Sequence, residues 1–168
     1  KSEKIIKANA ANLRKLAAAG KLGEHKLEDA LGILSLLSTG EEEDLAIVSS
    51  IYRQRMSGFK PESIANHAWN NGYQGIAACE YYLRTGDKSV IPLINAICES
   101  ARKWEVHGSW THWAEAVTKY GVVNACGTNV LTTLLLAKQC GAKVDDETMQ
   151  RSLRFFYRFA GHGANPYG

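Results

Sequence analysis

Histidine, tryptophan, tyrosine and asparagine gather in three stretches of the sequence, residues 60–73, 105–127 and 161–168. These stretches hold four of the 5 histidines and three of the 4 tryptophans. Flat aromatic faces beside neutral hydrogen-bonding groups suit an extended neutral ligand such as a glycan or a peptide. The candidate ligand-binding residues are His67, Trp69, Asn71, Tyr73, His107, Trp110, His112, Asn124 and His162.

The same residue types also have structural uses. A His-Gly pair, as at His107 and His162, suits the end of a helix, because glycine takes the left-handed conformation and an imidazole lies near the negative end of the helix dipole. Asn71 and Asn124 precede expected helices and would serve as N-caps. Trp104 is interpreted as a core residue.

Zinc binding would need several of these histidines, with Cys126, to converge. The spacing of His107 and His112 matches neither the i, i+3 nor the i, i+4 relation of a helix, and no zinc signature is present. We therefore expect no metal and no cofactor. His25, between Glu24 and Lys26, is interpreted as a solvated surface residue.

Catalysis by other groups has weak support in the sequence. Glycoside hydrolysis needs two facing carboxylates, and the candidates are Glu62, Glu105 and Glu115. Cys126, beside Gly127 at an expected helix N-terminus, would have a lowered thiol pKa and could act as a nucleophile. A packed thiol is the alternative for Cys126, and no catalytic residue is assigned.

The elements that must position these residues are all helices, because apolar residues recur with a period of 3.6 in nearly every segment. An amphipathic helix is expected over residues 2–19 and should pack on the first of three helix pairs. The pairs are expected at 27–38 with 43–56, 73–84 with 90–104, and 128–140 with 146–160. Each pair is joined by a short turn that contains Gly40, Gly86 or Gly141, which ends the first helix in the left-handed conformation.

The two helices of a pair differ in polarity. The segments 76–83 and 130–137 are apolar or small nearly all round, which indicates burial on every side, whereas 94–104 and 149–160 carry one apolar stripe. This predicts an inner and an outer layer. If the short glycine turns share one end of the array, the longer connections form a rim at the other end.

Composition is consistent with one domain, since 168 residues fall within the range of roughly 100 to 200 for a single domain. The net charge of +3 comes from scattered residues, which argues against nucleic acid as a partner. The longest uncharged apolar run, 130–137, is too short for membrane insertion. Four widely spaced cysteines are expected to be mainly reduced and buried, with a single disulfide as the alternative.

The stretches 69–73 and 80–87 resemble the hairpins of α/α toroids, the architecture of terpenoid cyclases, prenyltransferases and many glycan-processing enzymes. The segments 107–110, 120–132 and 155–168 resemble an uncharacterised bacterial toroid family whose members are sometimes fused to PDZ modules. The resemblance covers roughly residues 60–168. It implies an exported bacterial protein, with no established activity.

The sequence thus predicts an all-α domain of tandem helical hairpins in two layers, a partial α/α toroid. It would consist of an N-terminal helix (1–20) and hairpin units at 26–58, 60–108 and 109–168. We expect a piece of a larger toroid, whose inner helices are exposed here or are covered by a second copy or by rearrangement of the N-terminal helix. The expected protein partners are a second copy or the remaining domains of a parent chain. The first hypothesis for its function is a non-catalytic binding module for a glycan or peptide. The second is part of a glycan-processing hydrolase or lyase.

Overall fold

The structure, a computed structural model, describes residues 2–22, 26–113 and 116–161. It confirms the all-α fold: these residues form no β-strand, only isolated bridges between His67 and Trp113 and between Val106 and Ser109. The elements are, in chain order, α1 (Ser2–Ala18), α2 (Leu27–Thr39), α3 (Glu42–Met56), η1 (Pro61–Ser63), α4 (Ala68–Thr85), η2 (Lys88–Val90), α5 (Ile91–Trp104), α6 (Val117–Tyr120), α7 (Asn124–Gln139) and α8 (Asp146–Tyr157).

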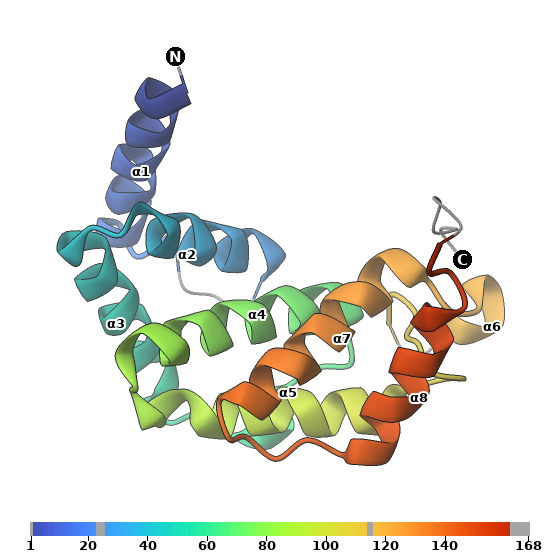
Figure 1. The fold of residues 1–168 in the computed structure, drawn as a ribbon. Coiled ribbons are helices and arrows are strands. Elements are labelled where there is room, and N and C mark those ends of the chain that lie inside the picture. The colour runs from blue at the N-terminus through green and yellow to red at the C-terminus, as the bar shows by residue number, and fades with distance from the viewer. Residues whose placement is uncertain (1, 23–25, 114–115, 162–168) are drawn as a thin grey trace.

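The helices pack in two layers (Figure 1). The first helices of the three pairs are neighbours, because α4 packs along α7 on one side and against α2 on the other. The second helices α3, α5 and α8 pack against α2, α4 and α7, respectively. The predicted layering is therefore present, while closure of the hairpins into a ring stays a prediction.

Glycines allow α4 and α7 to approach closely. A Cβ atom added to Gly72 would lie 2.8 Å from the Cβ atom of Asn129, and one added to Gly75 would lie 2.2 Å from Cγ2 of Thr133. The Thr133 hydroxyl donates a hydrogen bond of 2.7 Å to the carbonyl oxygen of Gly72. Small residues and this buried bond fix the two inner helices against each other.

The core lies between the layers and includes all four cysteines. Cys79, Cys98, Cys126 and Cys140 are free and buried, so the predicted burial is confirmed. Burial raises the pKa of the Cys98 thiol to about 12 and that of the Cys126 thiol to about 11. These thiols behave as small apolar groups.

The predicted glycine turns are confirmed. Gly86 has a φ of 69°, and its N–H donates to the carbonyl oxygen of Tyr82, which ends α4. Asp87 then accepts a hydrogen bond from the N–H of Ser89 at the start of η2. The predicted start of α4 at Tyr73 is wrong, because the helix begins at Ala68.

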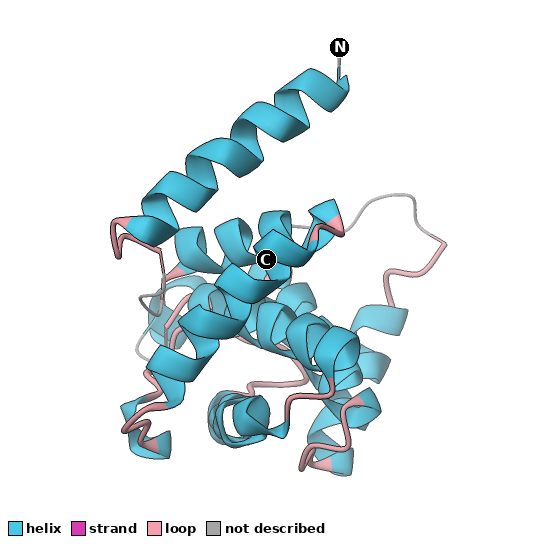
Figure 2. Cartoon of the chain, turned by 90° about the vertical axis from the view of Figure 1, so that its left-hand side faces the viewer, coloured by secondary structure: helices cyan, strands magenta, loops and turns pink. Residues whose placement is uncertain are grey.

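α1 packs on the first helix pair, as predicted, and Figure 2 shows it standing at an angle above the other helices. Arg14 donates to both carboxylate oxygens of the buried Asp44 on α3, at 2.6 and 3.0 Å. The hydroxyl of Thr39 donates to the same carboxylate at 2.6 Å. These bonds, the one from Arg14 above all, lower the pKa of Asp44 below its usual range.

Candidate functional site

The long connections meet at the N-terminal ends of α4 and α7. The N–H of Ala68 donates to the carbonyl oxygen of His112, and the N–H of Val123 donates to that of Trp110, at 3.0 and 2.7 Å. The segment 110–113 therefore joins the starts of the two inner helices. We call the residues around it, His67, Trp69, Asn71, Trp110, His112 and Trp113, the rim.

An aromatic group lies at the surface of the rim. The indole N–H of Trp69 donates to Nδ1 of His112 at 2.7 Å, and the imidazole of His112 contacts the ring of Trp113 with centroids 5.7 Å apart. Partial burial, together with the neighbouring His112, lowers the pKa of His67 below its ordinary value of 6.5. His67 is therefore mainly neutral at pH 7 and accepts a hydrogen bond from the N–H of Asn70 at the start of α4.

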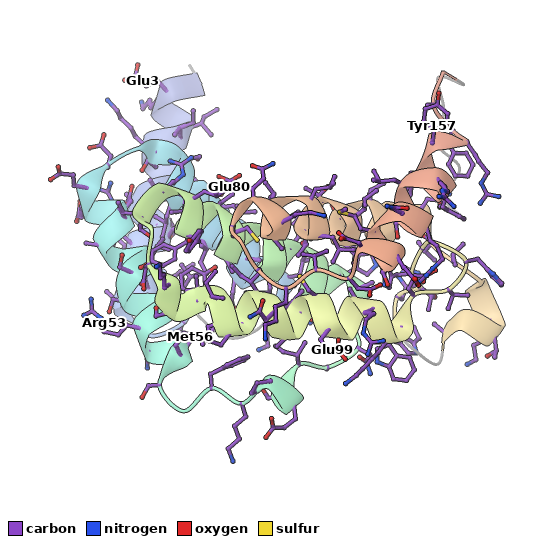
Figure 3. The ribbon with its side chains drawn as sticks, turned by 60° about the horizontal axis from the view of Figure 1, so that its bottom comes forward. Glu3, Arg53, Met56, Glu80, Glu99 and Tyr157 are labelled. Atoms are coloured by element: carbon purple, nitrogen blue, oxygen red, sulfur yellow. The ribbon has the colours of Figure 1, made fainter. Side chains whose placement is uncertain are left out.

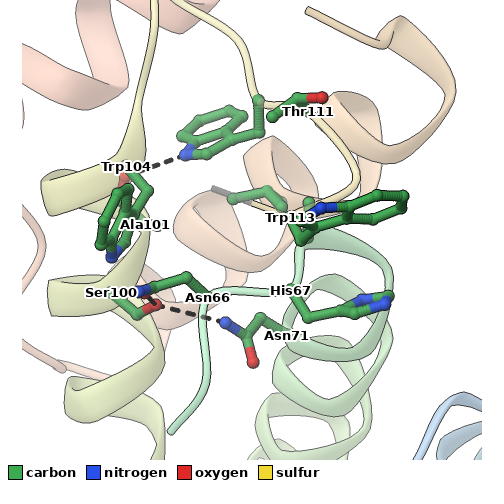
Figure 4. Close-up of a pocket in the computed structure, with 11 residues that line it drawn as sticks. Asn66, His67, Asn71, Ser100, Ala101, Trp104, Thr111 and Trp113 are labelled. Atoms are coloured by element: carbon green, nitrogen blue, oxygen red, sulfur yellow. Dashed lines mark hydrogen bonds between the residues drawn. The ribbon is translucent and has the colours of Figure 1, made fainter. Parts of the chain in front are cut away.

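A small cavity of about 20 Å³ is lined by His67, Trp110 and Trp113 among others (Figure 4), with room for about one water molecule. The amide Nδ2 of Asn71 donates to the carbonyl oxygen of Ala65, and the Ser100 hydroxyl donates to Oδ1 of Asn66. Oδ1 of Asn71 and the hydroxyl of Thr111 are buried and have no hydrogen-bond partner among the described residues, and both residues line the cavity. The cavity thus has a mainly apolar lining with a few polar groups, and it is too small for an organic ligand.

A much larger groove of about 920 Å³ runs between η1 and the outer face of α5, which face each other in Figure 3. We call it the α5 groove. Trp104, at the end of α5, is 43% exposed and lines both the groove and the rim cavity, as do Asn66 and Ser100. The groove is lined by Pro61, Glu62, Ile64, Asn66, Pro92, Asn95, Ala96, Glu99, Ser100, Lys103, Trp104 and Lys143.

The polar groups in the groove are oriented by their neighbours. Arg102 donates to both oxygens of Glu99 at 2.8 and 2.7 Å, and Lys103 lies 3.6 Å from the same carboxylate. The bonds from Arg102 lower the pKa of Glu99, so Glu99 is an ionised acceptor at neutral pH. Oδ1 of Asn95 accepts a hydrogen bond from the N–H of Lys143.

The structure brings five of the predicted binding residues together at the rim: His67, Trp69, Asn71, Trp110 and His112. Trp110 is only 3% exposed, and its indole N–H donates to the carbonyl oxygen of Ala101, so it supports the rim from within. Tyr73 is half-buried against the core.

Three predicted residues do not belong to this group. Asn124 is buried as the first residue of α7. His107 lines a separate depression beside α8. His162, His25 and Glu115 lie outside the described residues.

Three interpretations of single residues need correction. The N-cap of α4 is His67 rather than Asn71, and that of α7 is Val123 rather than Asn124, since each helix begins earlier than the sequence suggested. Trp104 is half-exposed rather than a core residue, and it is the last residue of α5.

Of the two interpretations of Cys126, the structure supports the packed thiol and contradicts the lowered thiol pKa. Its thiol donates to the carbonyl oxygen of Val123, and burial raises its pKa to about 11, although its own backbone N–H and that of Gly127 act in the opposite direction. Desolvation thus outweighs the helix N-terminus. Among the described residues, no group of three or more histidine, cysteine or acidic side chains could hold a metal ion.

Sequence reasoning missed most of the groove. Asn95, Glu99 and Lys103 recur every four residues on α5, which is typical of a solvated helix face. Their neighbour across the groove, the segment 61–66, lies about thirty residues earlier and its position is set by tertiary packing. The one usable signal was Pro61 after a helix, which indicates a rigid connection rather than a flexible one.

The fold and the site define a two-layered helical-hairpin domain with an aromatic rim and a polar groove beside it. This chain belongs to the family described as a domain of unknown function (DUF6288), which it matches over residues 2–168. Comparisons with curated proteins and with solved structures found no significant match. No helix among the described residues is long and apolar enough to cross a membrane.

Proposed function

We propose that this domain is a non-catalytic binding module of the α/α-toroid type and that the α5 groove holds a glycan. The observation that carries the proposal is the half-exposed indole of Trp104 at the edge of a 920 Å³ groove. Pockets of 300 to 1,000 Å³, about this size, are usual for small ligands. A short oligosaccharide would fit along α5.

The chemistry of the lining favours a sugar. The flat indole can stack on the C–H face of a pyranose ring, while its edge stays in water. The amides of Asn66 and Asn95 offer both donors and acceptors, Glu99 accepts, and Lys103 donates, which matches the mixed demands of hydroxyl groups. A peptide would use the same groups, but it has fewer hydroxyl groups for Glu99 and Lys103 to bind.

A second candidate is a glycan-processing enzyme, because two carboxylates, Glu62 and Glu99, line the same groove. Glycoside hydrolysis needs one carboxylic acid with a raised pKa. The pKa of Glu99 is lowered by Arg102, so Glu99 is suited to a base or nucleophile and not to the acid. Only Glu62 would remain for the acid, and it is exposed, so binding is the better-supported function.

The experiment is a titration of the domain with neutral oligosaccharides of several linkages. Binding is measured by calorimetry and by tryptophan fluorescence. Trp104→Ala should weaken binding more than tenfold, whereas Tyr157→Ala, which removes an aromatic ring exposed on α8, should leave it unchanged. Loss of binding in Trp113→Ala but not in Trp104→Ala would place the ligand at the rim and contradict the groove. Binding of peptides but no glycan would also overturn the proposal.

Product analysis distinguishes a glycan-processing enzyme from a binding module. Release of reducing ends or unsaturated sugars by the wild-type domain, abolished in both Glu62→Gln and Glu99→Gln, would favour catalysis. If the domain is a binding module, both variants should bind glycans with altered affinity and no variant should release products.

A further inference from the structure

A second depression, of about 520 Å³, lies beside α8 and shares no lining residue with the α5 groove. Two arginines of α8, the arginine at its C-cap and one histidine from the turn after α5 surround a buried phenylalanine. None of these lining residues is acidic. They are His107, Arg151, Arg154, Phe155 and Arg158.

Arg151 is already paired and has a positioning role. Its guanidinium donates to the carboxylate of Glu105, with contacts of 2.6 and 2.7 Å, and the side chain of Glu105 is only 7% exposed. Glu105 also accepts a hydrogen bond from the N–H of Gly108. These bonds attach the turn after α5 to α8, and with it the imidazole of His107.

Arg154 and Arg158 are not neutralised in this way. Both are exposed, and no carboxylate among the described residues forms an ion pair with either. The guanidinium of Arg158 lies 4.6 Å from the centroid of the Phe155 ring, and its Nε donates to the carbonyl oxygen of Phe155. A cation held on an aromatic face keeps its outward N–H groups available for a ligand.

His107 has an unfavourable backbone conformation. Its φ is 54°, and it is the one non-glycine residue with positive φ in the described part of the chain. It is followed by Gly108 at φ 91°, and two hydrogen bonds between Val106 and Ser109 close the turn. Two successive residues with positive φ form turns of the type I′ kind, where asparagine or glycine is preferred.

Packing against α8 explains the glycine at 108, but it does not explain the histidine at 107. A Cβ atom on Gly108 would lie 2.7 Å from the carbonyl oxygen of Arg151, so α8 requires glycine at that position. Histidine at 107 costs on the order of 1 kcal/mol relative to a residue that prefers this conformation. A strained residue beside two arginines that form no ion pair among the described residues points to a role for its side chain.

We propose that the depression beside α8 binds an anionic oxygen group, a phosphate or a carboxylate, through Arg154, Arg158 and the imidazole of His107. Planar guanidinium groups match the paired oxygens of both anions, and the imidazole supplies a further N–H donor. Phe155 forms an apolar floor that reduces competition from water. The site is separate from glycan binding in the α5 groove.

The test uses two probes, pyrophosphate and a trimer of galacturonic acid, in calorimetric titrations of the complete domain at low salt. Arg154→Gln and Arg158→Gln should each weaken binding of the preferred probe at least tenfold. Arg53→Gln removes the same charge from an exposed position on α3 and should change the affinity less than twofold. An equal loss in Arg53→Gln, or no binding of either probe, would overturn the proposal.

His107→Asn provides the second measurement. Asparagine accepts the conformation of the turn, so this variant should fold with an unchanged or higher melting temperature and yet bind the probe several-fold more weakly. A lower melting temperature with unchanged affinity would show that the imidazole is structural and would contradict its role. Preference for pyrophosphate indicates a phosphorylated ligand, and preference for the trimer indicates an acidic glycan.

Discussion

Substitution of Gly75 by alanine tests the packing on which the whole architecture depends. In an exposed helix this change would stabilise the protein by about 1 kcal/mol, because alanine is the better helix former. Here the new Cβ atom would lie 2.2 Å from Cγ2, 2.6 Å from Oγ1 and 3.0 Å from Cβ of Thr133 on α7. The side chain of Thr133 must therefore move, or the two helices must separate.

The structure determines which effect is larger. Overpacking of a well-packed core costs about 1–3 kcal/mol. Rotation of Thr133 would also break its buried bond to the carbonyl oxygen of Gly72, at about 1 kcal/mol. After the helix-propensity gain is subtracted, Gly75→Ala should lower the free energy of unfolding by roughly 1–3 kcal/mol.

The assay is urea unfolding monitored by circular dichroism, with Gly32→Ala as the matched control. Gly32 also lies inside a helix, but its new Cβ would mainly meet Cδ1 of Leu22, the end of a flexible side chain. We expect Gly32→Ala to be neutral or stabilising. Thr133→Ala should partly rescue Gly75→Ala, with a coupling energy of about 0.5–3 kcal/mol. If Gly75→Ala stabilises as much as Gly32→Ala, the close contact of α4 with α7 is refuted.

Three other side chains give predictions that one measurement each can check. Because the pKa of Asp44 is lowered on folding, its carboxylate stabilises the fold above the ordinary pKa of 3.8, and this contribution is lost as the pH falls through the lowered pKa. Asp44→Asn should therefore reduce the urea midpoint more at pH 7 than at pH 2.5. Equal reductions at the two pH values would contradict this. Cys126, with its pKa raised to about 11, should react with a disulfide reagent at pH 8 only after unfolding. Tyr81→Phe removes a 2.7 Å hydrogen bond to Asp87 and should cost about 1 kcal/mol in thermal unfolding.

The helices and their short turns could be predicted because they depend on local patterns. The apolar period identified each pair, and glycine at positions 40, 86 and 141 marked where the first helix of each pair ends. The start of α4 could not be found in this way. Asn70, Asn71 and Gly72 are poor helix formers, and they are helical because Gly72 lets α4 pack against α7.

The candidate site was predictable in part for the same reason. The layering predicted that the long connections share one end of the array, and segments of two of them, 60–73 and 105–127, do meet there. The third, 161–168, lies almost wholly outside the described residues. Neither the α5 groove nor the depression beside α8 has a local signature, because each is formed by segments that only tertiary packing brings together. The positive φ of His107 depends on the packing of Gly108 against α8 and is likewise not visible in the sequence.

The two proposed sites are connected by residues 104–107, the last residue of α5 and the turn that follows it. This connection gives a final prediction. Trp104 lines the groove and His107 lines the anion site, and three peptide units between them span at most about 11 Å. An oligosaccharide of a few rings with acidic groups is long enough to contact both. If one ligand does so, joining the two contacts should raise its affinity well above that of either part.

Oligogalacturonates of increasing length distinguish one bridging ligand from two separate ones. With bridging, the affinity should rise steeply once the chain reaches both sites, and Trp104→Ala and Arg154→Gln should each remove most of that gain. Their combination should then cost less than the sum of the single effects, because either change alone already prevents bridging. Additive effects at every length would show that the groove and the anion site bind their ligands independently.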